Sequence, residues 1–221
     1  MIELDDELPI VEELHPAPDA EAAFLALSKQ AKCLFLDSAL RDHHVGRYSF
    51  LTADPYAFLE VAADGSDGLA ELAKQLPSRV ASRQDLPPFQ GGAAGLFSYD
   101  LGRSLEQVAA AEFDEFKVPA MAVGLYDTVV SFDHEQGRAW IVSQGFPEQD
   151  PRARRDRARE RVRTFRTWMT TPAAAPPASS PVQAALTRDE LSRQFPVGSM
   201  RSEEHTSELQ SRRNLVCRLP L

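Results

Sequence analysis

The sequence predicts an α+β fold, a mostly antiparallel sheet covered by helices. Residues 121–144 hold two apolar, β-branched runs on either side of a polar DHEQGR turn, which is typical of an antiparallel hairpin. Helical patterns at residues 19–30, 67–76 and 151–169 lie between such runs in a mixed order. Because strands and helices do not alternate regularly, we expect antiparallel strands with helices packed on them rather than a parallel sheet.

The first helix is expected over residues 19–30 and is followed by a strand. Asp19 can accept hydrogen bonds from the first free amides of the helix, and Phe24 and Leu27 give it an apolar side. The next run, CLFLDSA at residues 33–39, is short and mostly apolar. That pattern predicts a buried strand.

The middle of the chain predicts a broken strand, a helix and a glycine-bearing strand. Residues 47–62 alternate like a strand interrupted at Asp54-Pro55, since proline cannot donate to a strand ladder. A second helix is expected over residues 67–76. Residues 87–106, PPFQGGAAGLFSYDLGRSLE, contain a Gly-Gly pair, but their spacing does not match a phosphate-binding glycine loop. We therefore interpret them as a strand packed closely against another sheet.

The third helix, residues 151–169, carries eight arginines, and two interpretations compete for it. A nucleic-acid surface is one. The other is a solvated amphipathic helix whose apolar stripe, Val162, Phe165 and Trp168, packs on the sheet. The formal net charge of -9 favours the second and argues against a nucleic-acid or anionic membrane partner.

The cysteine content and the hydropathy pattern indicate a compartment. Cys33 and Cys217 are the two cysteines, which is no disulfide framework, so a reducing cytoplasm is expected. No apolar run approaches the length of a membrane span.

The segment LFLDSALRDHHVGRYSF holds the candidate functional residues. The His43–His44 pair beside Asp42 suggests a metal site, but adjacent residues on a loop or strand point apart, and no further ligand that would complete a site appears at a recognised spacing. Ser38 lacks the G-x-S-x-G elbow of a nucleophilic serine. The remaining interpretation is a small-molecule pocket that combines a hydroxyl, Arg47 and an aromatic ring near one strand end.

Three blocks in order resemble a known family. PFQGGAAGLFSYDLGR, with LFLDSA…GRYSFLTADP before it and VPAMAVGLYDTVVSFDH after it, resembles the N-terminal region of component I of the chorismate-utilising enzymes over residues 10–195. The family includes anthranilate synthase component I and aminodeoxychorismate synthase component I (para-aminobenzoate synthase). Gln90 and the letters YDLGR are more similar to the aminodeoxychorismate branch.

The resemblance implies a function divided between two parts of a longer polypeptide. The larger C-terminal part would bind chorismate and Mg²⁺ and hold the catalytic residues, and a glutaminase subunit would supply ammonia. This chain would then be an N-terminal fragment of an enzyme that converts chorismate and ammonia into 4-amino-4-deoxychorismate for folate synthesis. It would contain no catalytic residue and no metal ligand, and it would be inactive alone. The alternatives are a fragment of anthranilate synthase component I, in tryptophan synthesis, and a free-standing tryptophan-binding module.

The resemblance also implies an effector pocket. Matching the blocks places a tryptophan or effector site at Ser38, Gly46, Arg47 and Tyr48. The anthranilate branch usually has Leu-Glu-Ser at the first of these positions, whereas this chain has Leu-Asp-Ser.

Four segments are expected along the chain. Residues 1–169 would be the component I N-terminal domain, and residues 170–185 a linker of proline, alanine and serine. Residues 186–196 resemble the first helix of the chorismate-binding domain, which would be truncated there. Residues 197–221 include RSEEHTSELQS, which is similar to a widely used sequencing-library adapter translated in frame, so we expect this tail to be an artefact.

Overall fold

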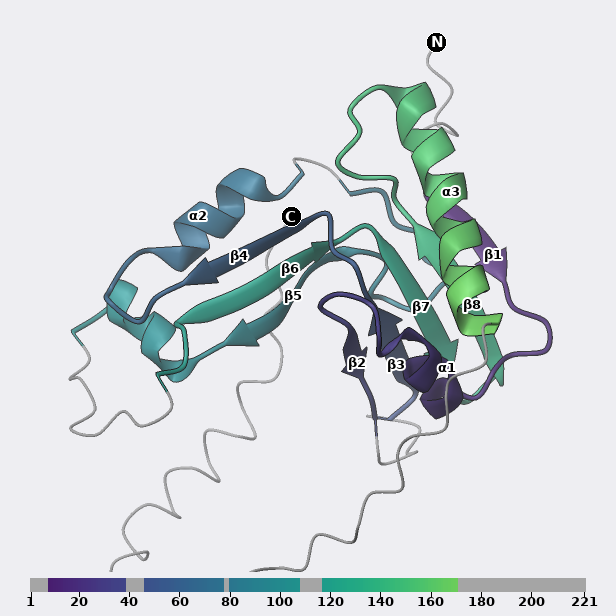
Figure 1. The fold of residues 1–221 in the computed structure, drawn as a ribbon, viewed down its shortest axis with the longest axis horizontal. Helices are drawn as coiled ribbons and strands as arrows, with labels where there is room; N and C mark the ends of the chain where they lie inside the picture. The colour runs from purple at the N-terminus through teal and green to yellow at the C-terminus, as the bar shows by residue number, and fades with distance from the viewer. Residues whose placement is uncertain (1–7, 39–45, 78–79, 108–116, 171–221) are drawn as a thin grey trace, which may run out of the picture. The chain divides into compact units, whose positions relative to one another are not determined.

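The computed structural model describes residues 8–38, 46–77, 80–107 and 117–170 (Figure 1). Residues Met1–Ala173 form one compact unit, which contains all the described helices and strands. The Asp-His-His segment at residues 42–44 lies outside the described residues. So do the linker beyond Thr170, the expected start of the chorismate-binding domain and the expected artefactual tail.

The described elements form an antiparallel α+β fold, which confirms the predicted class. The strands make a five-stranded sheet in the order β1-β8-β7-β3-β2 and a three-stranded sheet in the order β4-β6-β5, with every pairing antiparallel. The described strands therefore form two sheets, whereas the predicted fold class named one. In chain order the elements are β1 (Ile10–Glu13), α1 (Ala20–Leu27), β2 (Leu34–Leu36), β3 (Tyr48–Thr52), β4 (Ala57–Val61), α2 (Gly68–Gln75), β5 (Gly92–Phe97), the 3₁₀ helix η1 (Tyr99–Ser104), β6 (Met121–Tyr126), β7 (Thr128–Asp133), β8 (Arg138–Ser143) and α3 (Pro151–Thr170).

The chain passes from one sheet to the other at two aspartates. The predicted break at Asp54-Pro55 is confirmed, and it separates β3 of the larger sheet from β4 of the smaller one. Asp54 has a φ of 51°, a left-handed conformation that aspartate tolerates better than most residues. The second passage, at Asp127 between β6 and β7, was not predicted. The β7–β8 hairpin is confirmed, with Gly137 at a φ of 63° in its turn.

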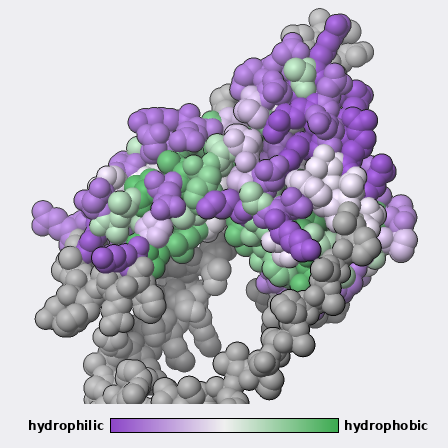
Figure 2. Space-filling view, in the orientation of Figure 1, coloured by the Kyte–Doolittle hydropathy of each residue, from purple (hydrophilic) through white to green (hydrophobic). Residues whose placement is uncertain are grey.

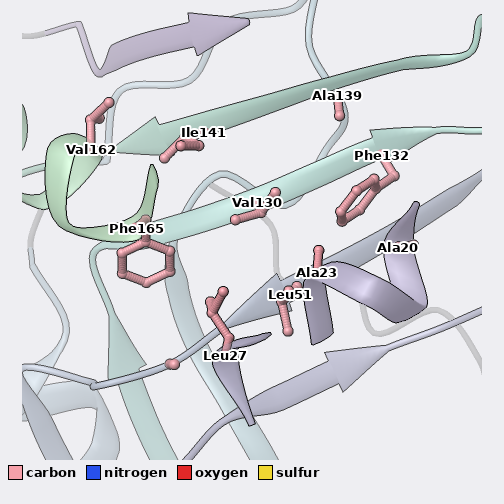
Figure 3. Close-up of a cluster of buried hydrophobic side chains, with 11 residues drawn as sticks. Ala20, Ala23, Leu27, Leu51, Val130, Phe132, Ala139, Ile141, Val162 and Phe165 are labelled. Carbon is pink, nitrogen blue, oxygen red and sulfur yellow. The ribbon is translucent and has the colours of Figure 1, made fainter. Parts of the chain in front are cut away.

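Two helices pack on the larger sheet and bury its core. Figure 3 shows Val162 and Phe165 from α3 and Leu27 from α1 near Val130 and Ile141 of the sheet. Phe165 and Leu27 are fully buried, so the predicted apolar stripe of α3 is confirmed. Asp19 caps α1 as expected, accepting a 2.9 Å hydrogen bond from the amide of Ala22.

The strand expected to be buried after α1 is instead at an edge. β2 is the last strand of the larger sheet and pairs only with β3 among the described strands. Its final residue, Leu36, is 45% exposed. An apolar run of this length cannot by itself distinguish a central strand from an edge strand, because both need one buried face.

The glycine-rich stretch forms a strand, as predicted, followed by the 3₁₀ helix. Its close neighbour is the paired strand β6 rather than another sheet: a Cβ atom on Gly95 would collide with the carbonyl oxygen of Ala122. Gly95 also has a φ of 153°, which L side chains rarely adopt. The glycine therefore allows β5 to approach β6 closely.

Several arginines of α3 bind the protein's own backbone and carboxylates. Arg161, 8% exposed, reaches both sheet crossovers: its Nη1 lies 2.6 Å from Asp54 Oδ2, and its Nε lies 3.4 Å from Asp127 Oδ1. Arg157 Nε donates to the carbonyl of Phe146 at 2.6 Å. Hydrophilic residues also gather over α3 in Figure 2. The amphipathic interpretation is confirmed, and the internal contacts of the arginines are an addition to it.

A membrane span was not found in the described part of the chain, where every helix is too short or too polar to cross a bilayer.

Candidate functional site

The strand register brings three chain segments together at the ends of three neighbouring strands of the larger sheet. β2, β3 and β7 are consecutive neighbours, with Leu36 opposite Phe50 and Tyr48 opposite Asp133. The residues after β2, at the start of β3 and at the end of β7 must therefore lie together. The site residues expected at Ser38, Gly46, Arg47 and Tyr48 all fall in this region.

Ser38 is tied directly to the start of β3. Its Oγ donates a 3.0 Å hydrogen bond to the carbonyl of Tyr48, and its backbone amide lies 3.4 Å from Ser49 Oγ. A serine hydroxyl has one donor and two acceptor lone pairs. With the donor used by the backbone, the chemistry that Ser38 can offer a ligand is acceptance of an N–H or O–H hydrogen bond.

Arg47 is held by a carboxylate of the β7 end rather than extended from the sheet. Its Nη2 lies 2.7 Å from Asp133 Oδ2, and its Nε contacts both oxygens of that carboxylate. Glu135 Oε2 is a further 3.2 Å contact of Nε. The guanidinium also lies 4.9 Å from the centre of the Tyr48 ring, a cation–π distance. Arg47 and Tyr48 thus form one surface, with buried Gly46 directly before them in the chain.

This ion pair shifts the pKa of both partners. The hydrogen bond to Asp133 raises the pKa of Arg47. Burial acts to raise the pKa of Asp133, but the hydrogen bonds from Arg47 and from the amides of Gln136 and Glu135 outweigh it and leave that pKa below its usual value. Both groups are therefore charged at neutral pH, and the surface that they form keeps its salt bridge.

Three residues that the sequence patterns did not single out lie together at these strand ends: Asp37, Ser49 and His134. Ser49 Oγ donates to Asp37 Oδ1 at 2.7 Å and lies 2.7 Å from His134 Nε2. His134 also donates its backbone amide to the carbonyl of Arg47 at 2.9 Å. One signal was present: Ser49 is a polar residue among apolar neighbours in a strand. His134 belongs to the DHEQGR turn, which suggested only a hairpin.

A cavity of about 460 Å³ lies beside Asp133 and His134, but Ser38, Gly46, Arg47 and Tyr48 are not among the residues that line it. Asp133, His134 and Arg138 from the β7–β8 hairpin line one part of it, and Asp19 and Ala20 at the start of α1 line another. Its walls mix polar and apolar groups, as small-molecule sites do.

A magnesium site does not fit the residues that the structure describes. No three His, Cys, Asp or Glu side chains among them come together in a way that could hold a cation. Mg²⁺ prefers near-octahedral oxygen ligands, which such a cluster would have to supply in part.

Comparison with known proteins reveals clear relatives. The chain is 34% identical over 153 residues to aminodeoxychorismate synthase component 1 of Klebsiella aerogenes, covering 62% of the chain and 33% of that protein. It is 32% identical over 160 residues to the protein of that name from Escherichia coli (strain K12), covering 59% of the chain and 35% of the relative. Anthranilate synthase component 1 of Streptomyces coelicolor is 30% identical over 145 residues, which cover 66% of the chain and 27% of the relative.

These relatives are much longer than the part that aligns. The chain spans about a third of the length of the two aminodeoxychorismate synthases. The profile of the family described as chorismate binding enzyme matches residues 32–196, which is most of the chain. The match begins just before β2, runs through α3 and ends at residue 196. The chain therefore belongs to the chorismate-binding enzyme family.

Proposed function

We propose that this chain is the N-terminal part of an aminodeoxychorismate synthase component I. The observation that carries the proposal is the length and identity of the alignments taken together. They extend over 153 and 160 residues at 34% and 32% identity for the two bacterial proteins of that name, against 124 residues at 34% and 145 residues at 30% for two anthranilate synthase components. Gln90 and the YDLGR block point to the same branch. In the proposed reaction, ammonia forms a C–N bond at C4 of chorismate as the C–O bond to the 4-hydroxyl breaks, and water leaves.

We further propose that the catalytic groups lie in polypeptide beyond these residues. The alignments cover about a third of the relatives, so most of such an enzyme has no counterpart here. Chorismate and Mg²⁺ would bind in that larger part, and a glutaminase subunit would supply the ammonia, consistent with the name "component 1" of the relatives. The sparse cysteines fit a cytoplasmic enzyme. The chain alone is then expected to be inactive.

The test compares the chain alone with a restored enzyme. The chain is incubated with chorismate, an ammonium salt and Mg²⁺, and so is a chimera in which residues 1–185 precede the C-terminal part of the Escherichia coli relative. Chromatography separates 4-amino-4-deoxychorismate from anthranilate. We expect no product from the chain and 4-amino-4-deoxychorismate from the chimera. Turnover by the chain alone would refute the proposed division of function. Residues 1–185 joined instead to the C-terminal part of an anthranilate synthase component 1 test the branch: an active enzyme from that fusion, together with an inactive first chimera, would favour the anthranilate branch.

The candidate site at the ends of β2, β3 and β7 supports a second role, the binding of tryptophan or a similar amino acid. Ser38, Arg47 and Tyr48 are joined there by a hydrogen bond and a cation–π contact. The serine oxygen could accept from an ammonium group, and the exposed part of the Arg47–Tyr48 surface offers a flat face to an indole ring. Calorimetry with the full chain tests this role, and the absence of heat at millimolar tryptophan would contradict it.

A further inference from the structure

One buried hydroxyl joins the strand ends that carry the candidate effector site. Ser49 in β3 is 0% exposed, and its Oγ contacts Asp37 just after β2 and His134 just after β7, each at 2.7 Å. The backbone amide of Ser38 lies 3.4 Å from the same oxygen. The Ser49 hydroxyl therefore connects groups at the ends of three neighbouring strands.

The chemistry of the four groups assigns the protons. The Ser49 hydroxyl donates its single proton to Asp37 Oδ1. Its two lone pairs are then available to the amide of Ser38 and to His134. Because an accepting oxygen needs a donor opposite it, His134 must carry a proton on Nε2 in this arrangement. Every hydrogen-bonding capacity of the buried hydroxyl is then used, as buried polar groups require.

We propose that Ser49 and His134 are positioning residues for the effector site. They hold the backbone of Ser38 so that its side chain meets the carbonyl of Tyr48 and its lone pairs face a ligand. The inference rests on the proposed effector role of Ser38. It adds that the Nε2–H donor of His134, and not the imidazole ring as an apolar surface, is the feature that supports binding.

Two roles of His134 can be separated because its ring also packs. The ring stacks on Phe132 with centroids 6.5 Å apart and an interplanar angle of 7°. His134→Phe keeps a ring for this stack and removes the donor. His134→Gln removes the ring and keeps an N–H donor of similar reach. A positioning role predicts damage from the first substitution, and a packing role predicts damage from the second.

The experiment measures tryptophan affinity of the full chain by calorimetry, together with hydrogen exchange at the Ser38 amide. We expect His134→Phe and Ser49→Ala to weaken binding about fivefold to tenfold, the equivalent of one lost hydrogen bond. His134→Gln should remain within about twofold of the parent chain. Ser131→Ala is the matched control, since Ser131 is a buried serine of neighbouring β7 whose hydroxyl contacts the carbonyl of Phe89 instead.

Each outcome decides the proposal. Equal affinities for all four variants, or weaker binding by His134→Gln than by His134→Phe, would overturn it. If the parent chain does not bind tryptophan, the proposed effector role fails separately, and amide exchange decides on positioning. Faster exchange at Ser38 in Ser49→Ala and His134→Phe than in Ser131→Ala supports the positioning role, and equal exchange rates refute it.

Discussion

Replacing Arg161 by methionine should destabilise the domain by about 3 kcal/mol, at the lower end of the cost of removing one partner from a buried ion pair. The Arg161 side chain is 10% exposed and the Asp127 side chain 1% exposed, so the remaining carboxylate cannot recover solvation. Arg157 still lies 3.6 Å from Asp127, which limits the loss. The same substitution also removes the 2.6 Å contact with Asp54, so both sheet crossovers lose their shared cation.

The cost of this substitution should depend on pH with a definite sign. Burial raises the pKa of Asp127, and the charges of Arg161 and Arg157 oppose that rise. A carboxyl with a raised folded pKa contributes stability below its unfolded pKa, and this contribution is lost as pH rises through the folded value. Removing Arg161 raises the folded pKa further. The destabilisation should therefore be smallest near pH ~4 and should grow toward pH ~7.

Denaturant unfolding of the parent chain and the variant across that pH range measures the effect. Arg159→Met is the matched control, because Arg159 is 53% exposed and pairs only within the helix, with Asp156, in the contacts that the structure describes. An exposed pair of this kind contributes about 0.3–0.5 kcal/mol. Adding Asp127→Asn to Arg161→Met should recover part of the loss at neutral pH. A cost for Arg161→Met that equals the control, or that does not change with pH, would refute the reasoning.

Three further predictions concern other parts of the domain. Asp133→Asn should lower the free energy of unfolding at neutral pH. The difference from the parent chain should vanish as pH falls through the depressed pKa of Asp133, because Arg47 stabilises the carboxyl only while it is ionised. Urea titrations at several pH values measure this difference, and a difference that stays constant with pH would contradict the prediction. Gly95→Ala should lower the stability of the domain by about 1–3 kcal/mol through its backbone conformation alone, and the collision with β6 should add to this loss. Gly102→Ala is the control and should have a mild effect, because the space around Gly102 is open. Equal melting temperatures for the two variants would contradict this prediction. Burial raises the pKa of Cys33 to about 11, so its alkylation should be on the order of 100-fold slower than that of an exposed cysteine. Peptide-resolved mass spectrometry measures this rate, and comparable rates would show that the thiol is not buried.

Local patterns in the sequence determined the helices, the hairpin and the break at Asp54. Asp19 caps α1, and the stripe that contains Val162 and Phe165 is buried, because both depend on the spacing of a few neighbouring residues. The position of Gly137 in the hairpin turn is likewise a local requirement. These features were therefore readable without any knowledge of tertiary contacts.

The assignment of strands to sheets required the tertiary structure. Asp127 stands between two apolar runs that together look like one long strand, and nothing local indicates that β6 and β7 belong to different sheets. What stabilises a buried carboxylate there is Arg161, a cation on a helix that begins much later in the chain. A single polar residue within a strand pattern is compatible with a turn, a bulge or an exposed edge, so its meaning depends on its partner.

The candidate site shows the same division. Ser38, Gly46, Arg47 and Tyr48 were selected because the sequence blocks that contain them resemble those of a known family. Only the fold shows that Arg47 is bound to Asp133, 86 residues away, and that Ser49 reaches His134, 85 residues away. The antiparallel register of β3 and β7 brings these pairs together, and register follows from which faces the whole sheet buries, a property that no short segment of sequence contains.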